Sequence, residues 1–429
     1  MKVSLHYGQG QIVIEIPQEN VAEVIRPRHM GLLHISDVEI VRRAIDDARG
    51  DFCENVLGRT VGVLLPDGTR DLSLDVILPQ LLPLMKNAKK ILFFICTGTH
   101  PADTPENQKI IERIQSEARK VNLPEYEIIA HDCRRADFVS AGSTERRTEI
   151  LYHRRLQEPT IFAALSDVKH HYFAGYSNPI KNFVPGLCAF KTVEKNHSWT
   201  MDAASCAGVH PWHPNPSLRD NPLAQDQLEA MTMIAGNRPV WALVTRSTGG
   251  QIQWAAFGPA QQVTGQAFLK ADSFNCFSAQ RVAKMIVSPG GLPNDVDLYI
   301  AQRALELTAG VVYDGGEVLF LSACPKGVGS LQTAEQFYDK LIRPLDEIKA
   351  SDRNQYKLFS HKPWRFSTLI RRLKRLWLYS EIDNSEIEKI HMAPCDDPQA
   401  VVDGWLAENP QEKILIVDSA NKVLLRPAK

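Results

Sequence analysis

Two histidines and one lysine near the middle of the chain have side chains that can do chemistry. His171 precedes Lys181 by ten residues, and His197 follows Lys181 by sixteen. Imidazole exchanges protons near neutral pH and binds nickel-like metals, while a lysine amine can form a covalent bond. Glycines and prolines between these residues predict a shaped loop. The set is competent for acid–base, metal or covalent chemistry, although thirteen histidines in 429 residues also produce chance clusters of structural histidines.

Further polar side chains directly follow apolar runs that are typical of buried strands. They are Asp67 and Arg70 after 61–65, His100 after 91–96, and the His171 segment after 160–164. Ligands of parallel α/β sheets gather at the carboxyl ends of the strands. We therefore expect these side chains to form one active site.

The elements that must position these residues alternate strand and helix through both halves of the chain, as α/β domains do. We expect an α/β fold of two α/β domains with the active site in the cleft between them. The N-terminal, cofactor-binding catalytic domain is expected at 1–268 and a smaller C-terminal α/β domain at 280–429. The expected strands are 2–7, 11–16, 61–65, 91–96, 126–130, 160–164, 283–287, 317–322 and 413–417, and the expected helices are 36–48, 72–86, 105–120, 297–309, 333–341 and 365–378.

Composition excludes several classes of protein. The net charge is -1, from 49 basic and 50 acidic side chains, which gives no global field for nucleic acid or an anionic membrane. The eight cysteines form no CxxC pair, which disfavours a disulfide scaffold or a structural zinc site. Apolar runs such as 91–96 are too short to span a bilayer, and the start lacks a signal peptide. We expect a cytoplasmic protein with small-molecule partners.

The order and spacing of these motifs resemble the nickel-pincer nucleotide-dependent lactate racemase family over essentially the whole chain. The motifs that carry the resemblance are Asp67-Gly68-Thr69-Arg70, Thr97-Gly98-Thr99-His100, the run from His171 to Lys181, Pro185-Gly186, Asn196-His197, Gly290-Gly291, Asp297-Leu298-Tyr299, Gly315-Gly316 and His361-Lys362. The resemblance implies an isomerase, a racemase or epimerase that inverts C2 of a 2-hydroxyacid by reversible hydride transfer.

The resemblance also implies a cofactor, pyridinium-3,5-bisthiocarboxylic acid mononucleotide nickel. Lys181 would tether it through a thioamide, and His197 would be the protein's ligand to nickel. Proteins that make the cofactor would then be partners, and an apo form would carry Lys181 unmodified. His100 and His171 would work on opposite faces of the substrate, one removing the hydroxyl proton and the other returning it.

Supporting residues follow from the same chemistry. Asp67 is expected to orient a histidine, by carboxylate–imidazole pairing, and Arg70 to hold a phosphate or carboxylate. Each also has a simpler interpretation as an Asp-Gly turn with a solvated arginine. His170 is the alternative to His171, which we prefer because it directly precedes the Tyr172-Phe173-Ala174-Gly175 run.

The sequence departs from the family pattern at two places. Asn178-Pro179 replace two glycines before Lys181, which restricts the backbone there. After Tyr299, the family's glutamine and lysine are replaced by Ile300 and Arg303. Arg303 still suits a carboxylate, whereas Ile300 removes a hydrogen-bonding group and favours a larger or more apolar 2-hydroxyacid than lactate. Tyr299 and Trp364 are further candidates for lining the pocket.

Two other functions remain open at this point. One is a zinc hydrolase built from His100, His171 and His197 with Asp67 activating water. The other is an inactive relative that binds a nucleotide or hydroxyacid. The run His210-Pro211-Trp212-His213 is not expected to bind metal, because a proline between the histidines suits no helical ligand pair.

Overall fold

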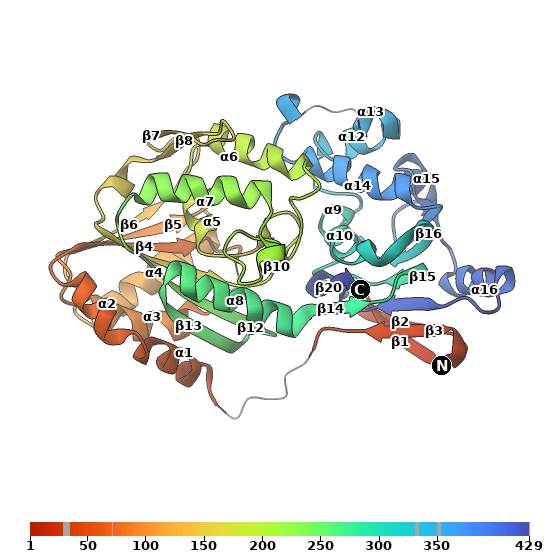
Figure 1. Cartoon of the computed structure of the whole chain (residues 1–429), viewed down its shortest axis with the longest axis horizontal. Helices are drawn as coiled ribbons and strands as arrows, with labels where there is room; N and C mark the ends of the chain where they lie inside the picture. The colour runs from red at the N-terminus through yellow and green to blue at the C-terminus, as the bar shows by residue number, and fades with distance from the viewer. Residues whose placement is uncertain (29–34, 71, 331–333, 350–352, 429) are drawn as a thin grey trace. The chain divides into compact units, whose positions relative to one another are not determined.

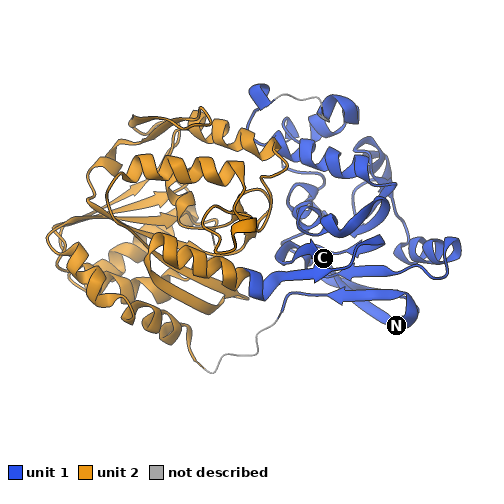
Figure 2. Cartoon of the chain, in the orientation of Figure 1, with its two compact units in different colours: residues 1–29, 272–429 blue, residues 30–271 orange. Residues whose placement is uncertain are grey.

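The computed structural model describes residues 1–28, 35–70, 72–330, 334–349 and 353–428 (Figure 1). The chain forms two compact units (Figure 2). The central unit comprises residues 30–271, and the terminal unit joins residues 1–29 to residues 272–429. Each unit contains its own six-stranded sheet.

The sheet of the central unit has the strand order β13-β12-β9-β4-β5-β6. Neighbouring strands from β12 to β6 are parallel, and only the edge strand β13 pairs antiparallel among these described strands. The strands of this unit are β4 Thr60–Pro66, β5 Lys90–Cys96, β6 Tyr126–Ala130, β7 Phe138–Ser143, β8 Glu149–His153, β9 Ile161–Asp167, β10 His170–His171, β11 Gly175–Tyr176, β12 Val240–Thr248 and β13 Gln251–Pro259. The helices are α1 Asp37–Asp46, α2 Arg49–Val56, α3 Leu74–Leu81, α4 Pro105–Lys120, α5 Ile180–Phe183, α6 Phe190–His197, α7 Pro222–Ala235 and α8 Ala260–Asn275.

Both faces of this sheet are buried. Alternate residues of β4, such as Val61 and Val63, pack in one core with α1, α2, α3 and α4. On the opposite face, Val244 packs with Phe268 of α8, and the ring of Phe162 contacts that of Phe183 at 5.2 Å. Burial on both faces explains why these strands are continuous apolar runs in the sequence.

The sheet of the terminal unit has the order β18-β17-β16-β15-β19-β3 and is parallel throughout its described pairs. Its strands, with two smaller sheets, are β1 Lys2–Tyr7, β2 Gly10–Glu15, β3 Val21–Ile25, β14 Cys276–Ala279, β15 Val282–Val287, β16 Val312–Leu321, β17 Arg375–Tyr379, β18 Ala393–Pro394, β19 Ile414–Val417 and β20 Leu424–Pro427. The helices are α9 Leu298–Ala301, α10 Arg303–Thr308, α12 Tyr338–Leu341, α13 Leu345–Lys349, α14 His361–Arg372, α15 Asn384–Lys389 and α16 Pro398–Glu408.

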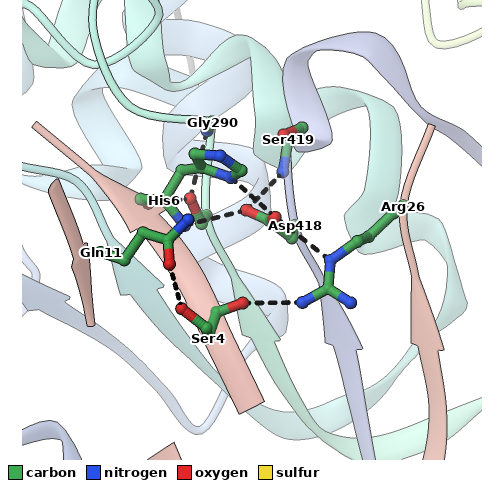
Figure 3. Close-up of polar contacts among 8 residues, drawn as sticks. Ser4, His6, Gln11, Arg26, Gly290, Asp418 and Ser419 are labelled. Atoms are coloured by element: carbon green, nitrogen blue, oxygen red, sulfur yellow. Dashed lines mark hydrogen bonds and ion pairs between the residues drawn. The ribbon is translucent and has the colours of Figure 1, made fainter. Parts of the chain in front are cut away.

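A buried carboxylate ties the two ends of the chain together in the terminal unit (Figure 3). Asp418, which follows β19, accepts hydrogen bonds from the backbone N–H of His6 at 3.1 Å, from His6 Nδ1 at 2.8 Å and from Arg26 Nε at 3.4 Å. The Ser288 hydroxyl, which follows β15, donates to the backbone oxygen of His6. These bonds hold the β1–β2 hairpin against the carboxyl ends of β15 and β19.

The structure confirms the α/β class and corrects two details. Residues 1–29 belong to the terminal unit, because β3 pairs with β19, whereas the predicted boundary placed them with residues up to 268. The helix predicted at 365–378 is wrong in its second half, since α14 ends at Arg372 and β17 begins at Arg375. The helix predicted at 333–341 starts among residues 331–333, which lie outside the described residues, and α12 covers its end.

The chain passes from one unit to the other between residues 271 and 272, inside helix α8. Among the described helices, none has the length and apolar composition that a membrane crossing requires.

Candidate functional site

The three strands at the middle of the central sheet, β9, β4 and β5, lead into the predicted site residues. Asp67 directly follows β4, His100 lies four residues beyond β5, and His171 lies four residues beyond β9. Because β4 pairs in parallel with both neighbours and Pro66 is opposite Cys96, these segments leave the sheet at the same edge. Strand order therefore explains why residues far apart in sequence meet at one edge.

Asp67 and His100 form a hydrogen-bonded pair at this edge. The 2.6 Å contact joins His100 Nδ1 to Asp67 Oδ2. Since a carboxylate only accepts, Nδ1 carries the proton and Nε2 of a neutral ring is left basic. The Asp67 side chain is 3% exposed, while that of His100 is 44% exposed. The pair thus presents an oriented base that solvent or a ligand can reach.

The carboxylate of Asp67 is kept ionised by its neighbours. Burial raises its pKa, but hydrogen bonds from His100 and Thr69 and the positive charges of His100 and Arg70 outweigh burial, so the pKa lies below its usual value. Arg70 is exposed, and its backbone N–H donates to Asp67 O at 3.0 Å. The guanidinium is therefore accessible to an anion.

Lys181 lies on the short helix α5, which is fixed to the ends of two strands. The Asn182 amide donates to the backbone oxygens of Leu64 at 3.1 Å and Leu165 at 2.8 Å. Asn178 Oδ1 accepts the Ile180 N–H at 2.9 Å, which satisfies a donor at the start of the helix. The Asn178-Pro179 departure thus forms an Asx turn that leads into the helix, with proline at the N-cap position.

His197 ends helix α6 and is held as a neutral ring. Its Nδ1 donates to the backbone oxygen of Val193 at 2.9 Å, so Nε2 keeps a lone pair. Burial and the positive charge of Lys181 lower the pKa of His197 to about 4. A neutral imidazole with a free Nε2 lone pair and an anchored Nδ1–H is the form that ligates metals. The residue therefore fits the role of a single protein ligand to nickel.

His171 and His197 both contact one aromatic ring, that of Phe173. The centroid of Phe173 is 4.4 Å from that of His171 and 5.6 Å from that of His197. His171 Nδ1 accepts the Ala174 N–H at 3.4 Å, which places the proton of a neutral ring on Nε2. His100 and His171 thus hold opposite tautomers. His170 is 4% exposed and its ring contacts that of Tyr176 at 5.2 Å, whereas His171 is only partly buried, which favours His171 for contact with a ligand.

The predicted substrate-binding residues lie in the terminal unit. Asp297 caps helix α9 by accepting the Ile300 N–H at 2.7 Å, and Ile300 is 41% exposed. Lys362 donates to the backbone oxygen of Tyr299, and its Nζ lies 3.6 Å from the Tyr299 ring centroid. Burial and the charge of Arg303 lower the pKa of Lys362 to about 7, against the carboxylates of Asp297 and Glu306.

Lys362 belongs to the His361-Lys362 motif, which by itself assigns it no role. It lies in the first turn of α14, which begins at His361, before the start of the helix predicted at 365–378. Another residue without an expected role is His210, which is fully buried in the central unit. Its run had been considered only as a metal ligand pair.

The three predicted histidines do not form a metal site by themselves. Among the described residues, no three or more His, Cys, Asp or Glu side chains gather as metal ligands. The zinc hydrolase reading requires such a set from the protein. The structure therefore does not support that alternative.

Comparison with known proteins identifies relatives across the chain. The lactate racemase N-terminal domain family model matches residues 7–208. A lactate racemase of Thermoanaerobacterium thermosaccharolyticum is 22% identical over 352 residues, which span 78% of this chain and 76% of that protein. A lactate racemase of Lactiplantibacillus plantarum is 21% identical over 356 residues, 79% of this chain and 78% of that protein.

Two solved structures share the fold. The lactate racemase apoprotein of T. thermosaccharolyticum superposes with a TM-score of 0.82 at 18% identity, covering 99% of this chain and 100% of that one. A crystal structure of a protein from Thermotoga maritima gives a TM-score of 0.58 at 14% identity, covering 90% and 98%. The N-terminal domain match, the two racemase relatives and the shared fold all agree with the resemblance to the lactate racemase family that the order of motifs carries.

Proposed function

We propose that this chain racemises or epimerises a 2-hydroxyacid at C2, using a nickel-pincer nucleotide tethered to Lys181. Both curated relatives are lactate racemases, which are isomerases. The observation that carries the proposal is the hydrogen bond between His100 Nδ1 and the buried Asp67 carboxylate, which leaves Nε2 of His100 as an oriented base. His171 follows the neighbouring strand β9 and is the second ring of the pair, which acts as the acid when it is protonated.

Inversion needs such a pair because hydrogen leaves C2 from one face and returns to the other. Hydride transfer avoids a carbanion at C2, and the bound nucleotide supplies the hydride acceptor. His100 Nε2 takes the hydroxyl proton, and Asp67 stabilises the imidazolium that results. His171 would return a proton to the oxygen from its protonated, imidazolium form when the other enantiomer forms, and so become neutral. The two rings then exchange roles in the reverse reaction.

Other residues of the central unit bind the cofactor in this proposal. Lys181 provides the amine for the thioamide, His197 Nε2 is the ligand to nickel, and Arg70 pairs with the nucleotide phosphate. The support for His197 is its neutral ring, fixed by the Val193 oxygen and influenced by the charge of Lys181. Proteins that make the cofactor are then partners of this chain. Eight free cysteines suit a cytoplasmic location.

The substrate is proposed to be more apolar than lactate. Arg303 is suited to the carboxylate because its planar fork makes two parallel hydrogen bonds. Ile300 is 41% exposed, and its aliphatic side chain favours an apolar substituent on C2 over a sugar acid. Tyr299 and Trp364 supply aromatic surface for the same purpose.

The proposal is tested by co-expressing the protein with the enzymes that make the cofactor and then measuring the intact mass and the nickel content of the purified protein. We compare wild type with Lys181→Ala and with Lys191→Ala, whose side chain is 63% exposed and paired with Glu149. A stoichiometric added mass with nickel is expected in wild type and Lys191→Ala and not in Lys181→Ala. Absence of an adduct under conditions that load a known racemase contradicts the nickel proposal.

Loaded protein is then incubated with single enantiomers of 2-hydroxyacids that differ in the size of their apolar substituent. Formation of the opposite enantiomer is expected, and it distinguishes a racemase from an inactive relative that only binds the cofactor.

A further inference from the structure

His210 is a buried histidine with one ring nitrogen that lacks a partner. The residue is 0% exposed, and Nδ1 accepts the Trp212 N–H at 3.1 Å. The proton of the neutral ring therefore lies on Nε2. Nε2 is buried and has no hydrogen-bond partner among the residues that the structure describes. An unpaired buried donor costs roughly 1–3 kcal/mol, so this arrangement calls for an acceptor from elsewhere.

The surroundings of His210 keep the ring neutral. Burial and the positive charges of His213 and Lys181 lower the pKa of His210 to about 3. The ring therefore acts as an N–H donor and not as a cation over the range in which the chain works.

His210 is held by close packing of its backbone and its ring. Its backbone N–H donates to Leu218 O at 2.8 Å, and its centroid lies 4.8 Å from that of Phe268. Gly175, with φ +77, lies so close that an added Cβ would be 2.0 Å from Val209 O and 3.4 Å from His210 Cβ. Gly208 N–H also donates to Gly175 O at 3.0 Å. The loop is thus packed against β11, whose partner strand β10 carries His171.

His210 and His197 both lie within the electrostatic reach of Lys181. The charge of Lys181 contributes to lowering the pKa of each ring. A lysine ammonium has three donors and no acceptor, so Lys181 as synthesised cannot accept from His210 Nε2. Acylation of the amine changes this, because a thioamide or amide brings an acceptor atom and removes the charge.

We propose that His210 is a positioning residue for the group carried on Lys181, with Nε2–H donating to an acceptor of the acylated side chain, the thiocarbonyl sulfur or an adjacent oxygen. This inference rests on the proposed function, since it requires the tether at Lys181. The proposal gives the run 210–213 the role of a hydrogen-bond donor to the tethered group, and not that of a pair of metal ligands. A donor of this kind fixes the orientation of the tethered group, and so the direction from which its metal meets His197.

The test uses loaded full-length chain in three forms, wild type, His210→Phe and His210→Gln. Phenylalanine keeps the packing on Phe268 and removes the donor, while glutamine returns an N–H. Loss of nickel to a chelator is expected to be about tenfold faster for His210→Phe, the usual scale for outer hydrogen bonds to metal sites, and closer to wild type for His210→Gln. The matched control is His131→Phe, another buried neutral histidine, whose Nε2 bonds Cys188 O at 3.0 Å. Its stability is expected to fall and its nickel retention to stay unchanged.

A second readout is made on the wild-type chain itself. Wild-type chain labelled with 15N-histidine is followed by NMR before and after loading, with His210 assigned by its loss in either variant or by elimination. The His210 Nε2–H resonance is expected to move on loading. The proposal is overturned if the His210 resonance does not move in protein whose mass shows the adduct. It is also overturned if His210→Phe retains nickel as well as wild type does. Either result leaves the proposed function intact. Absence of the adduct in wild type overturns both, and intact mass reports that case separately.

Discussion

Replacing Asp67 by asparagine tests whether a carboxylate makes His100 the base. Asp67 Oδ2 accepts from His100 Nδ1 at 2.6 Å, and Oδ1 accepts the Thr69 N–H at 3.2 Å. Asparagine has one acceptor oxygen and one NH₂ donor. Because the Thr69 N–H is fixed in the backbone, it retains the oxygen, and the NH₂ group then faces His100. The ring must accept at Nδ1, which moves its proton to Nε2 and removes the base.

The expected loss follows from the role of a general base. Such a base contributes about 10²–10⁴-fold, so kcat/KM of the Asp67→Asn variant should fall by that factor, or about 3–5 kcal/mol. Chiral chromatography of a single enantiomer over time measures the rate, and intact mass verifies equal loading on Lys181. Thr69→Val is the control, because it removes only the hydroxyl bond to Asp67 and should cost less than about tenfold.

The tautomer itself provides an independent measure. In the 15N spectrum of the unloaded variant, the proton of His100 should lie on Nε2, whereas in wild type it lies on Nδ1. Wild-type kcat/KM in Asp67→Asn, or a proton that remains on Nδ1 in the variant, would refute the reasoning.

Three further predictions concern other parts of the chain. Asn182→Leu removes two hydrogen bonds to strand ends and should lower the free energy of unfolding of the central unit by about 2–4 kcal/mol, measured in urea; an unchanged midpoint contradicts this. Burial raises the pKa of Glu317, but hydrogen bonds from Lys284 and two indoles lower it to about 2, so the stability it provides is complete above about pH 4.3 and is lost as pH falls toward 2. In Glu317→Gln the urea midpoint of unfolding should depend less on pH across that window than in wild type. An equal pH dependence in both proteins speaks against a stabilising role of the Glu317–Lys284 pair. Ile300→Gln should raise kcat/KM for lactate relative to a longer apolar 2-hydroxyacid by about tenfold, and an unchanged ratio removes Ile300 from the substrate site.

The sequence was sufficient to predict which residues gather at the carboxyl edge of the central sheet. Local apolar runs located β4, β5 and β9, and parallel pairing of neighbouring strands brings the residues that follow them to one edge. The strand predicted at 126–130 has the bounds of β6. These elements are encoded locally, by apolar runs followed by turn residues.

Non-local pairing could not be predicted in the same way. Nothing in the run 21–25 specifies that it pairs with β19 almost four hundred residues later. The basic residues of 371–375 continue from α14 across the turn into β17, so charge alone hid the end of the helix. The absence of a hydrogen-bond partner for His210 Nε2 among the described residues also depends on tertiary packing, because packing brings the loop of His210 onto β11.

The pairing of β3 with β19 at the edge of the terminal sheet has a consequence for how the chain folds during synthesis. Residues 30–271 are contiguous, so the central unit can fold while the ribosome is still translating. Strand β3 precedes this unit in the chain, yet its partner β19 and Asp418, which anchors His6, come after it. β3 must therefore wait, with an unpaired strand edge, while the residues between it and β19 are synthesised. Deleting β19 would leave that edge permanently open, so a nascent chain, or a chain truncated before β19, is the form most exposed to aggregation and to chaperones.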